Sequence, residues 1–355
     1  MTPLLLALLA FSLPAPGPDT PAREPQLAAH GTMAGMTYGA GGAIYFAASP
    51  DGGATFGPPV RVAEVPILPL NRHRGPRIAF SGPVIVISAV AGRTPAAGEH
   101  AHGLPADGDL LVWRSTDGGR TWAPPVTVND VPGAPTEGLH ALAADPKGNL
   151  FAAWLDKRGS GTMLYGAKST DGGRTWSKNV RIYASADGTI CQCCHPTVAF
   201  DASGAVLVMW RNVLGGDRDM YLVRSPDGAV FGEPGKLGKG SWKINACPMD
   251  GGGMALAGER LVTAWRREKT LYLSSPGGGE TAIAEGMDIA LAANSGGVLA
   301  VWTHAGSVQA LPPGARKPVT LSPKGAFPAA VSLPGGGFLA AWESEGGIEV
   351  RQIAP

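Results

Sequence analysis

The sequence predicts an all-β fold, a β-propeller of four-stranded blades, and three observations predict it. An eight-residue turn phrase recurs, short β-branched and aromatic segments lie between its copies, and no segment keeps the 3.6-residue periodicity of an amphipathic helix. Radial repetition of small antiparallel sheets protects their strand edges. Candidate hairpins near residues 33, 84, 149, 205, 260, 297 and 337 give seven blades. Six blades is the alternative if the first and last strands share one blade.

The composition fits a turn-rich folded chain and excludes one class of partner. Gly and Pro number 52 and 32 of 355 residues, 44% of the residues are hydrophobic and 16% are charged. Such a chain is rich in turns but apolar enough to bury a core. Because 29 basic side chains are balanced by 28 acidic ones, there is no broad basic surface for nucleic acid.

The N-terminal segment predicts export. An apolar run covers residues 1–13 and ends at a Pro-rich stretch, and it is too short to span a bilayer. We therefore assign residues 1–24 to a signal peptide and Pro-rich linker and residues 25–355 to the propeller. No later segment has 18 uninterrupted apolar residues, so we expect a secreted or periplasmic protein without a membrane span, and a monomer. An oxidising compartment would permit disulfides.

The turn phrase reads Ser-x-Asp-Gly-Gly-x-Thr followed by Phe or Trp. It occupies residues 49–56, 115–122 and 169–176, and a shortened copy occupies residues 225–231. The Asp is expected to cap backbone N–H groups, and Gly to adopt positive φ. The Ser and Thr hydroxyls would close the hairpin, and the terminal aromatic ring would anchor it on the sheet.

The strands are predicted from the segments between these turns. Two pairs of consecutive strands are predicted, one at residues 149–154 and 162–168 and the other at residues 205–210 and 219–224. Three later strands end in Trp, at residues 261–265, 297–302 and 338–342. We expect the recurring Trp side chains to pack between blades, and a carbohydrate platform is the less favoured role.

The turn phrase resembles the Asp-box, or bacterial neuraminidase repeat, of the sialidase superfamily of propellers. The order of Arg77-Ile78-Ala79, then Gly92-Arg93, then an acidic residue before the second copy is similar to the sialidase order. The resemblance implies that three Arg hold a sugar carboxylate, and by position these are Arg77, Arg211 and Arg266. Asp109, or Asp107, would stand for the acid/base.

The nucleophile that the resemblance implies is missing. Sialidases attack through a Tyr activated by a Glu, but Phe327-Pro328 occupies the Tyr position, and Cys194-His195 lies where the Glu is expected. We therefore expect a non-hydrolytic protein that binds a small molecule, a glycan or other anion, or a metal ion. The expected ligand-binding residues line a channel mouth: Arg77, Arg93, His140, Arg211, Asp250 and Arg266. The alternative is an exo-alpha-sialidase or a related glycoside hydrolase.

Two cysteine segments are the chain's own signature. Cys191-Gln-Cys193-Cys194-His195-Pro196 and Cys247-Pro-Met249-Asp250 each precede a predicted innermost strand. In a propeller the connection between blades opens on the face opposite the turn phrases. The two segments should therefore meet at the rim of the central channel.

Three kinds of chemistry remain open for this cluster. Four Cys allow two disulfides in one of three pairings. A soft metal ion such as copper(I) would suit the ligand set Cys191, Cys193, Cys194, His195, Cys247 and Met249, and it could be supplemented by His73, His100, His102, His140 or Met254. A redox dithiol of Cys191 and Cys194 is the least favoured, because no helix N-terminus is predicted to lower a thiol pKa.

Overall fold

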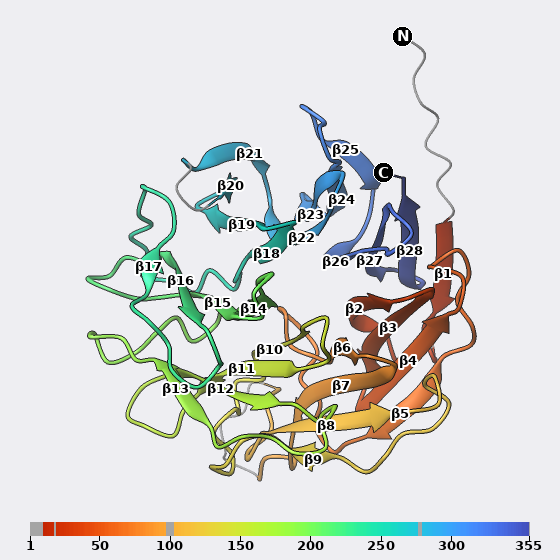
Figure 1. Ribbon diagram of the computed structural model, residues 1–355, viewed down its shortest axis with the longest axis horizontal. Helices are drawn as coiled ribbons and strands as arrows, with labels where there is room; N and C mark the ends of the chain where they lie inside the picture. The colour runs from red at the N-terminus through yellow and green to blue at the C-terminus, as the bar shows by residue number, and fades with distance from the viewer. Residues whose placement is uncertain (1–9, 18, 97–102, 276–278, 355) are drawn as a thin grey trace.

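The computed structural model describes residues 10–17, 19–96, 103–275 and 279–354. Seven four-stranded antiparallel sheets form a ring around a central channel (Figure 1). The prediction of seven blades is confirmed. The described residues include no helix, and therefore none that is long and apolar enough to cross a membrane.

The blades follow one another along the chain, each with its innermost strand first. Blade one contains β2 (Arg23–His30), β3 (Met33–Ala40), β4 (Ala43–Ser49) and β5 (Val60–Glu64); blade two β6 (Arg77–Ser81), β7 (Val84–Ala91), β8 (Asp109–Ser115) and β9 (Val126–Thr127); blade three β10 (His140–Ala144), β11 (Leu150–Asp156), β12 (Met163–Ser169) and β13 (Val180–Tyr183); blade four β14 (Thr197–Phe200), β15 (Val206–Arg211), β16 (Met220–Ser225) and β17 (Gly235–Lys236). The remaining three are blade five, β18 (Gly253–Ala257), β19 (Arg260–Arg267), β20 (Thr270–Ser274) and β21 (Thr281–Glu285); blade six, β22 (Met287–Asn294), β23 (Gly297–His304), β24 (Ser307–Leu311) and β25 (Val319–Ser322); and blade seven, β26 (Ala326–Ser332), β27 (Phe338–Ser344), β28 (Gly347–Ile353) and β1 (Ala10–Pro14).

Blade seven is completed by the N-terminal strand. β1 pairs antiparallel with β28, so the two chain ends share this blade (Figure 1). Leu13 is 2% exposed and packs in the cluster between blades seven and one with Leu339 and Val350. The shared blade does not reduce the count to six. The assignment of residues 1–24 to a signal peptide and linker stays a prediction, although residues 10–14 form a strand and β2 begins at Arg23.

The core lies between neighbouring blades. The second strands β11 and β15 are buried along their whole length, because a sheet packs against each of their faces. Trp154, Trp210, Trp302 and Trp342 are almost wholly buried, each within a different inter-blade cluster. These contacts confirm that the Trp residues pack between blades.

The turn phrases adopt the predicted hairpin chemistry between third and fourth strands. After β8, the Thr121 hydroxyl and N–H donate to the Asp117 carboxylate at 2.6 and 3.0 Å. The Ser115 hydroxyl donates to the same carboxylate at 2.8 Å and accepts from the N–H of Gly119. Gly119 has φ +88°, and a Cβ there would overlap the ring of Phe46. The turns that follow β4 and β12 repeat this pattern.

The strand order places the connections within a blade and those between blades in a fixed arrangement on the two faces of the ring. The turn between first and second strands and the turn between third and fourth strands lie on one face of the ring. The connection from one blade to the next therefore opens on the opposite face, where every innermost strand begins. Residues at the start of β2, β6, β10, β14, β18, β22 and β26 consequently surround one mouth of the channel (Figure 1).

Candidate functional site

The channel mouth encloses a small cavity. Its volume is about 170 Å³, and its walls come from all seven innermost strands and the segments that lead into them. His73, Arg77, His195 and Asp288 supply its charged and titratable groups. This cavity is smaller than the roughly 300–1,000 Å³ typical of organic-ligand pockets. Its size suits a hydrated ion or another very small ligand.

Three blades have the same irregularity of the backbone at this mouth, a β-bulge at the start of the innermost strand. Strands β2, β22 and β26 each have a register shift at their second residue, which is Glu24, Asp288 or Phe327. These residues have φ of 54°, 58° and 48°, a conformation that L residues seldom adopt. Strained backbone of this kind is concentrated at functional sites in proteins.

His73 is the centre of the contacts at the mouth. It has φ 66°, and its Nε2 lies 2.9 Å from Oδ1 of Asp288. Its backbone N–H donates to Oε1 of Glu24 at 2.9 Å. Its ring lies 4.3 Å from the ring of His195, and the ring of Phe327 meets it edge-on at 5.4 Å.

Asp250 adds a second carboxylate beside Asp288. It is 0% exposed, and its Oδ2 accepts from Arg266 Nε at 2.9 Å and from the Asp288 N–H at 3.2 Å. Its Oδ1 has no hydrogen-bond partner among the described residues, and neither has Nδ1 of His195. One ligand atom from each of His73, Asp250 and Asp288 lies within 4.8 Å of the other two.

The surroundings shift the proton affinities of these groups. Burial raises the pKa of Glu24 to about 7. Burial would lower the pKa of His73, but the hydrogen bond and charge of Asp288, together with other nearby carboxylates, outweigh it and leave that pKa raised. Burial and the charges of His73 and Arg77 hold the pKa of His195 well below its usual range.

The three Arg that the sialidase resemblance implied are used as braces for the backbone. Arg211 is 1% exposed and donates to the carbonyls of Asp250, Arg218 and Arg266 at 2.8–3.2 Å. Arg266 donates to the Asp250 carboxylate and to two backbone carbonyls. The buried Arg77 lines the cavity and donates to the carbonyls of residues 73, 75 and 76.

Other predicted site residues have local partners. Arg93 is half-exposed and lies 3.5 Å from the Asp107 carboxylate. Asp109 accepts from the Asn129 side chain at 2.7 Å and from a loop N–H. His140 is 0% exposed, its Nε2 lies 2.9 Å from the Ser88 hydroxyl, and burial lowers its pKa to about 3. None of Arg93, Asp109 and His140 lines the cavity.

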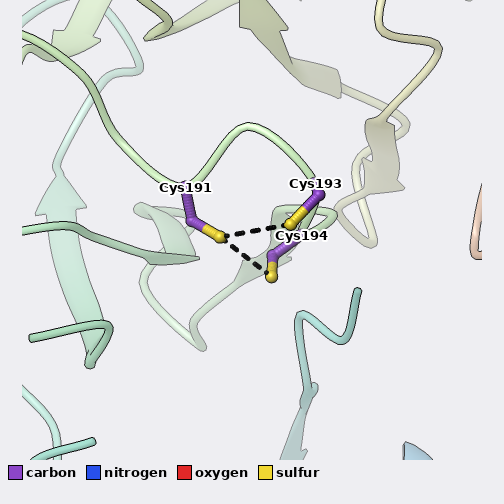
Figure 2. Close-up of side chains that lie close together, drawn as sticks. All are labelled: Cys191, Cys193 and Cys194. Atoms are coloured by element: carbon purple, nitrogen blue, oxygen red, sulfur yellow. Dashed lines mark hydrogen bonds between the residues drawn. The ribbon is translucent and has the colours of Figure 1, made fainter. Parts of the chain in front are cut away.

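A compact sulfur group lies in the loop before β14 (Figure 2). Sγ of Cys191 lies 3.1 Å from Sγ of Cys194 and 3.6 Å from Sγ of Cys193, and all three residues are buried. Nη1 of Arg218 donates to the Cys191 sulfur at 3.2 Å. Hydrogen bonding with the thiols of Cys193 and Cys194 lowers the pKa of Cys191, whereas the pKa values of Cys193 and Cys194 are raised.

The two cysteine segments lie side by side. Met249 packs against the sulfur group, and the Gly252 carbonyl accepts from Thr197 at 3.0 Å and lies 3.1 Å from His195 Nε2. Cys247, however, is exposed and lies outside the group. All four cysteines are free thiols in the structure. His100 and His102 lie outside the described residues.

Comparison with known proteins supports the fold. No protein-family model matches the sequence, and no curated protein matches it. Among solved structures, Hadza microbial sialidase Hz136 is similar at TM-score 0.59 and 15% identity, over 97% of this chain and 68% of that one. The intramolecular trans-sialidase from Ruminococcus gnavus is similar at TM-score 0.56 and 12% identity, over 97% of both chains.

A polysaccharide lyase of family PL25, an ulvan lyase, is similar at TM-score 0.58 and 11% identity, over 97% of this chain and 96% of that one. The neighbours therefore include sialidases and another carbohydrate-active enzyme, and the likeness at these identities shows a shared propeller fold.

Sequence reasoning missed two acidic residues of the mouth, Glu24 and Asp288. Glu24 falls in the segment that was assigned to the linker, and Asp288 follows a Gly-Met pair that gives no motif. What they share is their position in the repeat, because each is the second residue of an innermost strand, as Phe327 is in blade seven. A blade-by-blade alignment of strand starts would have brought them together.

Proposed function

We propose that this protein is an exported, non-hydrolytic, sialidase-like propeller that binds a soft metal ion, copper(I), through Cys191, Cys193 and Cys194. The observation that carries the proposal is the sulfur group itself, with Sγ separations of 3.1 and 3.6 Å from Cys191. Thiolate and thioether ligands favour copper(I) over harder ions. Met249, which packs against the group, supplies a thioether at its edge.

The electrostatics of the loop favour a thiolate, which is the form that binds metal. Arg218 donates directly to Cys191, and the charge of Arg211 also lowers the pKa of that thiol. Copper(I) would replace the protons that the three sulfur atoms share, so binding releases protons. His195 and Cys247 were predicted as further ligands, and neither belongs to the compact group of three thiols.

The same geometry argues against sialidase chemistry. A carboxylate-binding Arg needs free donors, but Arg211 and Arg266 direct theirs at backbone carbonyls and at Asp250. Phe327 has no oxygen to attack with, and no Tyr is among the described residues that line the cavity. These features support a binding role.

The test is competition for copper(I) with a coloured copper(I) chelator under anaerobic, reducing conditions. We expect the wild-type protein to take one copper(I) per chain, and Cys191→Ser and Cys194→Ser to lose it. Cys247→Ser is the matched control, because this exposed thiol lies outside the group. Equal copper retention by Cys191→Ser and wild type would refute the proposal. A thiol count on the protein as purified from an exporting host, without reductant, would detect disulfides instead.

A glycan or other anion at the channel mouth is the second candidate. It is favoured by the neighbours, whose names include sialidases and a polysaccharide lyase. An exo-alpha-sialidase would release the fluorophore from an aryl sialoside, and Arg77→Ala would abolish that release. We expect no release by the wild-type protein. Cell fractionation tests export to the periplasm or medium.

A further inference from the structure

The channel mouth contains buried carboxylates that the copper site leaves unexplained. Asp250, Asp288 and Glu24 are 0%, 5% and 1% exposed, and they lie around His73, with the guanidinium of Arg77 in the wall of the same cavity. Arg266 balances one oxygen of Asp250, while the other, Oδ1, has no partner among the described residues. A buried carboxylate oxygen without a partner is costly, because it has lost its hydration and gained nothing in return.

We propose that this mouth binds a divalent cation of the manganese(II) or zinc(II) class, with His73, Asp250 and Asp288 as its protein ligands. One ligand atom from each residue already lies within 4.8 Å of the other two. Around a metal with bonds of about 2.0–2.2 Å, such atoms lie roughly 3–4 Å apart, so the group needs only a modest contraction. A mixed imidazole and carboxylate set suits these ions, whereas thiolates select softer ones.

The surrounding structure prepares these ligands. Asp288 is turned into the mouth by the bulge of β22, and His73 by positive φ in the segment before β6. Arg266 and the Asp288 N–H fix Oδ2 of Asp250, which orients the carboxylate and leaves Oδ1 available. The Glu24 carboxylate holds the His73 backbone at 2.9 Å. Outer partners of this kind usually orient metal ligands.

The cavity has room to complete the coordination. Its volume of about 170 Å³ is several times the roughly 30 Å³ that one water occupies in the liquid. His195, whose buried Nδ1 also has no partner among the described residues, lies beside His73 at a ring separation of 4.3 Å. The cation would therefore keep several waters and remain open to a small anion that enters from the mouth.

The cation site is separate from the sulfur group, although neighbouring residues contribute to both. Met249 contacts the sulfur group, while the next residue, Asp250, has a ligand atom within 4.8 Å of those of His73 and Asp288. Likewise, Cys194 belongs to the sulfur group, while the next residue, His195, lines the cavity. Manganese(II) distinguishes the two sites, because it prefers oxygen and nitrogen ligands and binds thiolates poorly.

The experiment is a manganese(II) titration of the full chain, with free ion measured by electron paramagnetic resonance and zinc(II) binding measured by calorimetry in the Cys194→Ser background. We expect one manganese(II) per wild-type chain. Asp288→Asn and His73→Gln should each weaken binding at least about tenfold, the loss that removal of an outer partner already causes. Asp201→Asn, on the opposite face beside Arg224, and Cys194→Ser should bind manganese(II) as wild type does.

Two results would overturn the proposal. One is the absence of stoichiometric binding of either ion to the wild-type mouth. The other is unchanged affinity in folded Asp288→Asn and His73→Gln, with folding checked by thermal unfolding. Because Asp250 also pairs with Arg266, its substitution is not used as the decisive variant. Copper(I) binding by the sulfur group is measured separately, so either site can fail alone.

Discussion

Replacement of Arg211 tests whether this side chain is a structural brace or a ligand-binding group. In Arg211→Ala, the carbonyls of Asp250, Arg218 and Arg266 lose their buried guanidinium donor. The bonds to the Asp250 carbonyl are buried, and those to the carbonyls of Arg218 and Arg266 are part-buried. One buried carbonyl left without a partner costs about 1–3 kcal/mol, so the free energy of unfolding should fall by at least about 1–3 kcal/mol. That is a measurable part of the roughly 5–15 kcal/mol that stabilises a typical domain.

The assay is urea unfolding followed by Trp fluorescence, with the slope m compared between variants. Arg211→Lys should lose less than Arg211→Ala, because one ammonium replaces only part of the planar donor set. Arg224→Ala is the control, since Arg224 is half-exposed and its pair with Asp201 is worth about 0–1 kcal/mol. A loss below about 1 kcal/mol in Arg211→Ala would refute the brace and return this guanidinium to the ligand-binding candidates.

Three further predictions concern stability. Leu13→Ala, which removes a buried side chain of β1, should cost about 2–5 kcal/mol in urea unfolding. Hydrogen bonds from Thr55 and Ser49 lower the pKa of Asp51 from 3.8 to about 2, so its stabilisation is present above pH 3.8 and lost as pH falls to about 2; Asp51→Asn should flatten that limb of the acid-unfolding curve. Burial lowers the pKa of His140 from 6.5 to about 3, so the unfolded chain binds a proton first and stability falls as pH drops below 6.5; His140→Gln should lose this slope in unfolding measured between pH 7 and 4.

The blades were predictable from sequence because their signals are local. The Asp of each turn phrase and its Thr four positions later form one hydrogen-bonded unit, as Asp117 and Thr121 do. Strands ending in Trp were predictable for a similar reason, since a large ring after β-branched residues marks an inter-blade face. The innermost strand that was predicted to follow the first cysteine segment is present as β14, which begins at Thr197.

The uses of individual polar side chains were not predictable in the same way. Arg211 and Arg266 follow Trp at strand ends, as expected, but the sequence could not show that backbone carbonyls of the loop before β18 would occupy their donors. Those carbonyls come from residues 39 and 18 positions away along the chain. Their direction depends on the loop before β18, where Met249 has φ 59°. Only the folded ring determines which acceptors a guanidinium meets.

The equivalence of Glu24, Asp288 and Phe327 gives the mouth its asymmetry. The same bulge in three blades presents two carboxylates and one apolar ring toward His73. The three blades therefore share the backbone geometry, and the residue at the bulge determines which chemical group each one presents. A Tyr hydroxyl in place of Phe327 would add an oxygen on this side of the imidazole. Because Arg77, Arg211 and Arg266 would still donate to the backbone, that oxygen alone would not create a carboxylate-binding sialidase site. The sulfur group and the carboxylates of the mouth are therefore the groups on which binding by this propeller is proposed to depend.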